Sequence, residues 1–349
     1  MSADVTSAAS AQALGVSDIG ICLRAEYSDG YSMRRVGELS RLADELGYHS
    51  VWFAESWGHD SLVLASHVAA ITNRVKVGTA VINVFSRTPA QLAMAAATIA
   101  ELHPQRFLLG LGTSTKALVE GWHGLPFERP VRRMREVIEY LRQALSGEVV
   151  NYEGEIFRFS KYRLRNAPEQ SPPPLLAAGL GPSSIETIGH VADGWIPYLL
   201  PARGVGEAVS ALRDAAREAG RDPHELMVVA LIVAAVGDEE HAAEVVRRHL
   251  AYYLGAMGPH YREFVSRYGF AGIPRRIAEA WRDGRRDEAR RLVTDDMVRH
   301  LGVLGPAKTI PEQLTRYLQA GVDVPVLFFP GAESSTQVAA GLRELSEVL

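Results

Sequence analysis

The chain has 349 residues, of which 47% are hydrophobic and 22% are charged, and its formal net charge is -4 at pH 7. This composition is ordinary for a globular enzyme, and the negative charge argues against a nucleic-acid-binding protein, whose surface is normally basic. Cys22 is the single cysteine, so an internal disulfide and a cysteine metal cluster are excluded and a reducing, cytoplasmic location is expected. No apolar run is long enough to span a bilayer, so no membrane association is expected.

Residues 1–14 are rich in alanine and serine and lack the basic start and the apolar core of a signal peptide. We interpret them as a disordered tail. Residues 15–349 are interpreted as one domain, because apolar runs alternate with helical patterns along it. Two insertions break this alternation: a β-hairpin within about 147–174, and an arginine-rich helical segment over about 255–304.

Eight short apolar runs have the length and composition of buried strands. They lie at residues 19–23, 50–54, 75–84, 107–111, 175–178, 194–198, 226–236 and 324–329. A helical pattern follows each run. Ser32, Asp60 and Thr88 are the predicted N-caps of the first three helices, and Ser183 or Ser184 is that of the helix after the fifth strand.

Repeated strand–helix units predict a closed (β/α)8 barrel with parallel strands and right-handed crossovers. An open doubly wound sheet is the alternative. It is disfavoured because Gly110, Gly112 and Ser114 only partly match the dinucleotide-binding fingerprint, and no acidic residue follows at the expected spacing. In a barrel the active site lies at the carboxyl ends of the strands, so the residues there are the candidates.

These strand ends carry no serine elbow, no P-loop, no HExxH motif and no carboxylate cluster suited to a metal. His241 and His249 lie on a helix expected at the surface and are too far apart to share an ion. The sequence therefore predicts no metal site, and an organic cofactor positioned by the protein is expected to supply the chemistry.

Glycine-rich turns indicate where such a cofactor would lie. Gly179, Leu180 and Gly181 follow a strand and precede a helix, whose first N–H groups and dipole favour an anion such as a phosphate. Gly112 to Ser114 form a similar turn after the fourth strand. The alternative is that these glycines only make the turns.

Several segments resemble the luciferase-like monooxygenase superfamily, and in particular its branch of deazaflavin (coenzyme F420)-dependent oxidoreductases related to methylene-tetrahydromethanopterin reductase. They are GTAVINVFSRTP at 78–89, GLGTS at 110–114, EGWHG at 120–124, LLAAGLGPSS at 175–184 and GVDVPVLFF at 321–329. The combination is specific to the superfamily, and the likeness covers nearly all of the chain after the tail.

The resemblance implies a site for each part of the cofactor. A non-prolyl cis peptide between Ala80 and Val81 would support the tricyclic ring, Asn83 would hydrogen-bond its pyrimidine edge, and Glu55 and Ser56 would approach the ring and the reacting carbon. The turn after the fourth strand would add Gly112, Thr113 and Ser114. The cofactor phosphate would be held by Ala178, Gly179, Leu180, Gly181, Pro182 and Ser183.

The chain also departs from some relatives, including the sugar-phosphate dehydrogenases. Those carry a histidine after the strand-two acid and a glutamate in the strand-four turn, whereas Ser56 and Thr115 stand here. The acid and base roles known there therefore do not transfer, and glucose-6-phosphate oxidation is not expected.

The resemblance implies hydride transfer between C5 of the deazaflavin and a carbon of a small organic substrate, as in the reduction of an activated C=C or C=N bond. Glu55, with Ser56, is the candidate catalytic group and proton relay; the alternative is that Glu55 only accepts a hydrogen bond. Trp57, Trp122, His123 and Tyr198 are candidates to line the substrate pocket, although for the two tryptophans core packing under the loops is the favoured interpretation.

Two other functions stay open at this point: an FMN-dependent monooxygenase on the same barrel, and a cofactor-binding protein without turnover. A homodimer is expected, because the resemblance places association near the helix after the third strand. A stripe of small residues marks that helix: Ala93, Ala95, Ala96 and Ala97. The alternative for the stripe is close packing on the barrel itself.

Overall fold

The computed structural model describes residues 14–169 and 171–349. All but the last residue of the predicted tail lie outside these ranges. No helix in the described part of the chain is both long and apolar enough to cross a membrane.

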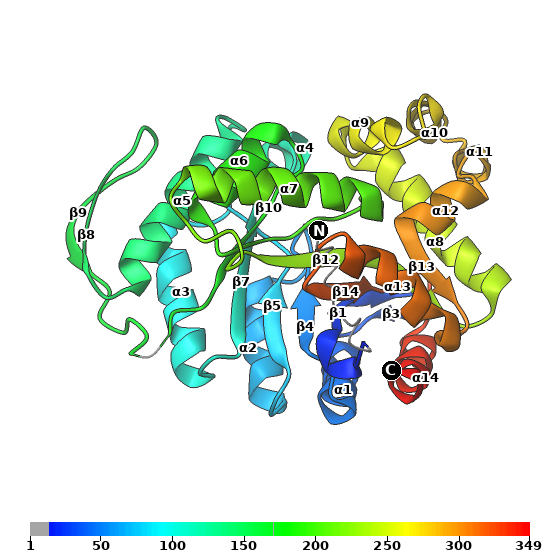
Figure 1. The fold of residues 1–349 in the computed structure, drawn as a ribbon, viewed down its shortest axis with the longest axis horizontal. Helices are drawn as coiled ribbons and strands as arrows, with labels where there is room; N and C mark the ends of the chain where they lie inside the picture. Colours follow the sequence, from blue (N-terminus) through cyan, green and yellow to red (C-terminus); the bar gives the residue numbers. More distant parts are fainter. Residues whose placement is uncertain (1–13, 170) are drawn as a thin grey trace, which may run out of the picture.

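Parallel strands form a closed barrel at the centre of the molecule (Figure 1). In chain order they are β1 (Gly20–Leu23), β4 (Ser50–Phe53), β5 (Lys76–Thr79), β7 (Phe107–Gly112), β10 (Leu175–Ala178), β11 (Gly194–Trp195), β12 (Met227–Val236) and β14 (Val324–Phe328). Each pairs in parallel with the next, and β14 pairs with β1, so the sheet closes on itself. The predicted (β/α)8 barrel is confirmed, and the open sheet is excluded.

Helices surround the strands and cover the outer face of the barrel (Figure 1). They are α1 (Met33–Leu46), α2 (Ser61–Ile71), α3 (Pro89–Leu102), α5 (Pro130–Leu145), α6 (Pro182–Val191), α7 (Ala202–Glu218), α13 (Ile310–Gln319) and α14 (Ser335–Val348), with short 3-10 turns η1 (Val16–Asp18) and η2 (Ala307–Thr309). The N-caps predicted at Ser32, Asp60 and Thr88 are all confirmed.

The inside of the barrel is packed around one large ring. Trp52 is fully buried, and a Cβ added to Gly78 would lie 2.3 Å from Cε3 of that indole. Cys22 belongs to the same buried cluster, and burial raises the pKa of its thiol to about 12. The thiol is therefore protonated at neutral pH, and Cys22 is a small core residue rather than a nucleophile.

The two predicted insertions are present. The hairpin consists of the antiparallel strands β8 (Val149–Glu153) and β9 (Arg158–Arg163), and it projects at the left of Figure 1. The helical segment follows α8 (Glu239–Ala256) and comprises α9 (Pro259–Arg267), α10 (Ile273–Arg282), α11 (Arg286–Arg291) and α12 (Asp295–Leu301). Its expected end at residue 304 is wrong, because the buried run at 302–305 forms strand β13 (Gly302–Gly305), which pairs with the end of β12.

Three short elements at the strand ends were not foreseen as separate elements: the hairpin strands β2 (Glu26–Tyr27) and β3 (Gly30–Tyr31) and the helix α4 (Lys116–Gly121). Each is too short to leave a periodic pattern in the sequence. The predicted strand at 75–84 is divided into β5 and the short strand β6 (Ile82–Asn83).

The alanine stripe of α3 does not form a free surface. Ala93, Ala96 and Ala97 are buried within the chain itself, where their small side chains let the helix pack closely. The surface predicted for association is therefore wrong in these residues, and the homodimer stays a prediction.

Candidate cofactor site at the carboxyl ends of the strands

The predicted cofactor residues come from neighbouring strands of the barrel. The strands β4, β5, β7 and β10 pair in that order, so the loops that follow them adjoin at one end. Glu55 follows β4, Asn83 follows β5, Gly112 ends β7 and Gly179 follows β10. The fold thus gathers residues that are more than a hundred positions apart in the sequence.

The third strand is interrupted where the sequence predicted one continuous run. The peptide bond between Ala80 and Val81 is cis, at the bond where the resemblance implies it. After this bond β6 pairs with the end of β7, placing Asn83 opposite Gly112. A Cβ on Gly112 would lie 2.4 Å from Cγ2 of Val81, so the close approach of these two segments requires glycine there.

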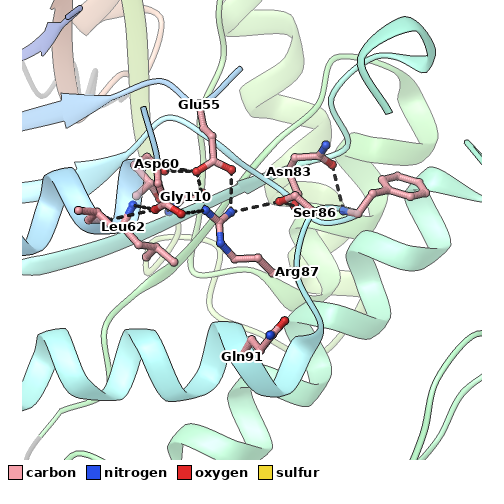
Figure 2. Close-up of polar contacts among 12 residues, drawn as sticks. Glu55, Asp60, Leu62, Asn83, Ser86, Arg87, Gln91 and Gly110 are labelled. Atoms are coloured by element: carbon pink, nitrogen blue, oxygen red, sulfur yellow. Dashed lines mark hydrogen bonds and ion pairs between the residues drawn. The ribbon is translucent and has the colours of Figure 1, made fainter. Parts of the chain in front are cut away.

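The side chain of Asn83 is almost fully buried, yet it is incompletely hydrogen-bonded in the described structure. It is 3% exposed, and its Oδ1 accepts a hydrogen bond from the Phe85 N–H at 2.9 Å. Its Nδ2 has no partner among the described residues. Figure 2 shows the amide oxygen engaged and the nitrogen directed away from that contact. A buried donor without an acceptor costs about 1–3 kcal/mol, so a ligand acceptor here would remove that cost.

The turn after β10 leads directly into the N-terminus of α6. Gly181, and not Ser183 or Ser184 as predicted, is the N-cap, and no side chain caps the helix. The Ser184 N–H donates to the Gly181 carbonyl at 2.9 Å, while that of Ser183 has no hydrogen-bond partner within residues 14–169 and 171–349. Because a glycine leaves the first turn without a competing side-chain acceptor, the helix start remains free to bind an anion.

Space at this turn is also suited to a ligand. A Cβ on Gly179 would lie 2.5 Å from the Ser184 Cβ, whereas one on Gly181 would meet no atom within 4 Å. Gly179, Leu180 and Gly181 are partly exposed, and Pro182 and Ser183 are exposed. In the layer between the strands and the helices, the Trp195 Nε1–H donates to the Gly179 carbonyl at 2.8 Å and fixes the start of the turn.

One residue of the turn after β7, Thr115, caps a helix. Thr113 and Ser114 are partly exposed, and Ser114 has a φ of 59°. Thr115 caps α4 by accepting a hydrogen bond from the Leu118 N–H at 3.3 Å. Thr115 is therefore a helix cap.

Glu55 is bound by a neighbouring arginine (Figure 2). Arg87 donates from Nη1 to its Oε1 at 2.7 Å and from Nη2 to its Oε2 at 2.9 Å, and Nη2 also pairs with Asp60 at 2.5 Å. Ser61 adds its N–H at 3.0 Å and its hydroxyl at 2.9 Å to Oε2. This geometry argues against the predicted proton relay, because every contact of the carboxylate is with a hydrogen-bond donor. Ser56 is exposed beside it.

The ion pairs around Arg87 also shift the pKa of its guanidinium. Burial by itself would lower the pKa of the guanidinium, but the hydrogen bonds and charges of Glu55 and Asp60 more than compensate, and its pKa is raised. Arg87 was not selected from the sequence, although it lies within the quoted SRTP motif. It joins the loop after β4 to the loop before α3, the two loops beside Asn83.

The residues predicted to line the substrate pocket divide into two groups. Trp57 and Trp122 are 51% and 64% exposed, so the interpretation of these two residues as core packing under the loops is wrong. His123 is half-buried on the loop after α4. Tyr198 is also half-buried, after β11, and lies away from the tryptophans against α8 and β14.

His249 contradicts the expectation of a surface histidine. It is 5% exposed and its Nε2 contacts the Tyr198 hydroxyl within hydrogen-bonding distance. The signal was present in the sequence: Ala242, Val245 and Val246 share its helical stripe and are buried with it. His241, on the other hand, is exposed as expected.

One described protein family matches most of the chain. Residues 18–324 match the family described as luciferase-like monooxygenase. The chain belongs to this family. The match includes all the strands that carry the predicted cofactor residues.

Individual relatives and structures agree with the assignment. A Mycobacterium tuberculosis protein assigned as a coenzyme F420-dependent oxidoreductase is 29% identical over 329 residues, covering 87% of this chain and 93% of the relative. The 5,10-methylenetetrahydromethanopterin reductase of Archaeoglobus fulgidus is 25% identical, covering 81% and 85%. The structure of the coenzyme F420-dependent tetrahydromethanopterin reductase of Methanopyrus kandleri has the same fold, with a TM-score of 0.81 at 24% identity, covering 95% and 98%.

Proposed function

We propose that this protein is a coenzyme F420-dependent oxidoreductase that transfers a hydride between C5 of the deazaflavin and a carbon of a small organic substrate. Reduction of an activated C=C or C=N bond is the reaction that we propose. The relatives named above support the cofactor. A bound deazaflavin would supply two-electron hydride chemistry, and the side chains described here would bind and orient it.

The observation that carries the proposal is the unpartnered Nδ2 of Asn83. The pyrimidine edge of a deazaflavin presents carbonyl oxygens, which accept the kind of hydrogen bond that this nitrogen has left unused. Gly112 lies opposite, where a larger residue would collide with Val81. The pair therefore offers a flat surface with one directed donor, which suits the edge of a planar ring.

The start of α6 supports the position of the phosphate. Gly181 exposes the helix N-terminus without a side-chain cap, and the dipole of this helix favours negative charge at that end. Since Asn83 and the start of α6 lie at the same end of the barrel, one elongated cofactor can occupy both.

Glu55 and Arg87 would then hold the loops of the site in position and would not transfer protons. Their bidentate pair fixes the loop after β4 against the loop that follows Asn83. Bidentate pairs add geometric specificity to their energy, so we expect them to hold both loops at a constant spacing from the ring.

Turnover tests the proposal. Under anaerobic conditions, the purified protein is mixed with reduced F420 and with a set of conjugated enones and imines, and the absorbance of oxidised F420 is followed. We expect oxidation of F420 in step with reduction of an acceptor. A protein that is yellow when purified, retains FMN and consumes oxygen would instead be the flavin monooxygenase, and binding without any turnover would indicate the non-catalytic alternative.

A further inference from the structure

A second group of side chains lies across the mouth of the barrel from the proposed cofactor residues. Tyr198 follows β11 and forms an isolated bridge beside β12, Phe328 ends β14, and α8 and α9 supply His249, Tyr253 and Tyr261. In Figure 1, α9 lies at the upper edge of the molecule, as does α4, which follows β7. We refer to these five residues as the aromatic cluster.

The tyrosine and phenylalanine rings of the aromatic cluster stand edge to face. The ring centroids of Tyr198 and Tyr253 are 5.0 Å apart, those of Tyr253 and Tyr261 are 5.0 Å apart, and those of Tyr198 and Phe328 are 5.6 Å apart. Aromatic pairs at this spacing and angle are stabilising, so the rings form a fixed wall. The three tyrosines are each only partly buried, so part of this wall faces solvent.

The polar atoms of the cluster are neutral at physiological pH. Burial raises the pKa of Tyr198, Tyr253 and Tyr261. Burial, and then the charge of Arg24, lower the pKa of His249 to about 3. The cluster therefore presents hydroxyl donors without charge, beside an imidazole that carries a single proton.

Tyr198 and His249 form the hydrogen-bonded pair within the cluster. The direction of that bond decides what Tyr198 can do, because a hydroxyl has one proton to donate. When Nε2 of the imidazole carries the ring proton, it donates to the phenol oxygen and leaves the hydroxyl proton free. His249 is then a positioning residue, and Tyr198 is the group that meets a ligand.

We propose that the aromatic cluster is the substrate site and that it takes a flat conjugated carbonyl compound, whose oxygen accepts a hydrogen bond from Tyr198 while His249 donates Nε2–H to the phenol oxygen. This inference rests on the proposed function for the hydride that the substrate receives. It narrows that function, because it favours a C=C bond conjugated to a carbonyl over a C=N bond.

Charge is the reason for this preference. A protonated C=N group is a cation and needs an anionic partner when it is taken from water. Glu26 of β2 is already paired with Arg24, and the Arg24 guanidinium lies 5.9 Å from the Phe328 ring centroid. Neutral hydroxyl donors suit a carbonyl oxygen, on which negative charge develops.

The reaction at this site balances without a further reagent. Hydride addition forms one C–H bond at the β-carbon and moves the electron pair of the C=C bond toward the carbonyl oxygen. Tyr198 stabilises that oxygen as its charge grows. The resulting enolate then takes one proton from water at the α-carbon, which restores the carbonyl.

A binding measurement on the cofactor-free protein tests the site. The probe is the 4-nitrophenolate anion, a flat conjugated compound whose oxygen accepts a hydrogen bond, as the enolate oxygen would, and whose absorbance changes when it does. We expect saturable binding to the wild type, weakened by about tenfold in Tyr198→Phe. The matched control is Tyr162→Phe, since Tyr162 is exposed on β9, far from the barrel mouth, and we expect its affinity to be unchanged.

Two substitutions of His249 test the direction of the hydrogen bond between His249 and Tyr198. His249→Gln keeps an N–H donor and should retain most of the probe affinity, whereas His249→Phe cannot donate and should lose as much as Tyr198→Phe. Thermal melting of each variant checks folding. Equal binding by Tyr198→Phe and wild type, or no binding at all, would overturn the proposal. Because no cofactor is present, failure here is separate from a failure to bind or oxidise F420.

Discussion

A single buried carboxyl illustrates how closely this end of the barrel is packed. Glu333 follows β14 and is 2% exposed, and its Oε2 has no hydrogen-bond partner in the described structure. Burial raises the pKa of this carboxyl from 4.5 to about 7. The folded state therefore binds its proton more tightly than the unfolded state does.

The sign of the resulting pH dependence follows from linkage. The contribution of Glu333 to stability is greatest below the unfolded pKa of 4.5, and it is lost as the pH rises through the folded value of about 7. We predict that the wild type loses roughly 2–3 kcal/mol more unfolding free energy than Glu333→Gln between about pH 5 and about pH 8. Urea denaturation of both proteins at the two pH values measures this difference, and parallel pH profiles would contradict it.

The pair of Arg87 and Glu55 makes a second prediction at the residue scale. Both side chains are largely buried, so Arg87→Met leaves a carboxylate without its partner and should cost roughly 3 kcal/mol of unfolding free energy. The matched control is Arg203→Met. Arg203 pairs with Glu207 on an exposed helix face, where the loss should be under about 1 kcal/mol. Similar losses of unfolding free energy in the two variants would show that the Arg87–Glu55 pair adds no more stability than an exposed pair does.

At the scale of the elements, one carboxylate attaches the inserted hairpin to the barrel. Glu136 of α5 is buried and accepts hydrogen bonds from the N–H groups of Glu155 at 2.9 Å, Ile156 at 3.0 Å and Phe157 at 3.0 Å. These donors belong to the turn between β8 and β9. A side chain from a helix thus adds to the turn's own hydrogen bond, which runs from the Gly154 N–H to the Phe157 carbonyl at 2.8 Å.

We predict that Glu136→Ala frees this turn. Amide hydrogen exchange at residues 155–157 should become faster by about tenfold or more, since each hydrogen bond contributes about 1 kcal/mol. Exchange in the barrel strands should not change. Glu153→Ala, at an exposed position of β8, serves as the control, and unchanged exchange in Glu136→Ala would refute the attachment.

Elements were predicted well where their signals are local. Thr88 caps α3 through Gln91, three residues away, and such a pair is visible in the sequence. The cap of α6 was wrong because Ser183 and Ser184 looked better than Gly181 on propensity alone. The strand β13 was missed because its four residues gain their stability from pairing with a distant strand, β12.

Across the whole molecule, the barrel was predictable because eight apolar runs repeat in one order. The contacts within the candidate site were not. Arg87 meets Glu55 across 32 positions, and Tyr198 meets His249 across 51. No periodicity encodes such pairs, since they depend on how separate loops meet at the end of a closed sheet.

Because the sheet is closed, the strands that surround its carboxyl end form two opposite arcs. The strands β4, β5, β7 and β10 form one continuous arc that carries the proposed cofactor residues, and β11, β12, β14 and β1 form the other. The aromatic cluster lies on the second arc. A cofactor ring on one arc and a substrate on the other would face each other, which is the arrangement that hydride transfer requires.

Calorimetric titration of the cofactor-free protein with oxidised F420, and separately with FMN, tests the central claim most directly. We predict one site for F420, binding of FMN at least about tenfold weaker, and a loss of about three- to tenfold in F420 affinity for Asn83→Leu. Asn73→Leu, at an exposed position, should bind F420 as the wild type does. Tighter binding of FMN, or equal F420 affinity in Asn83→Leu and wild type, would contradict the account.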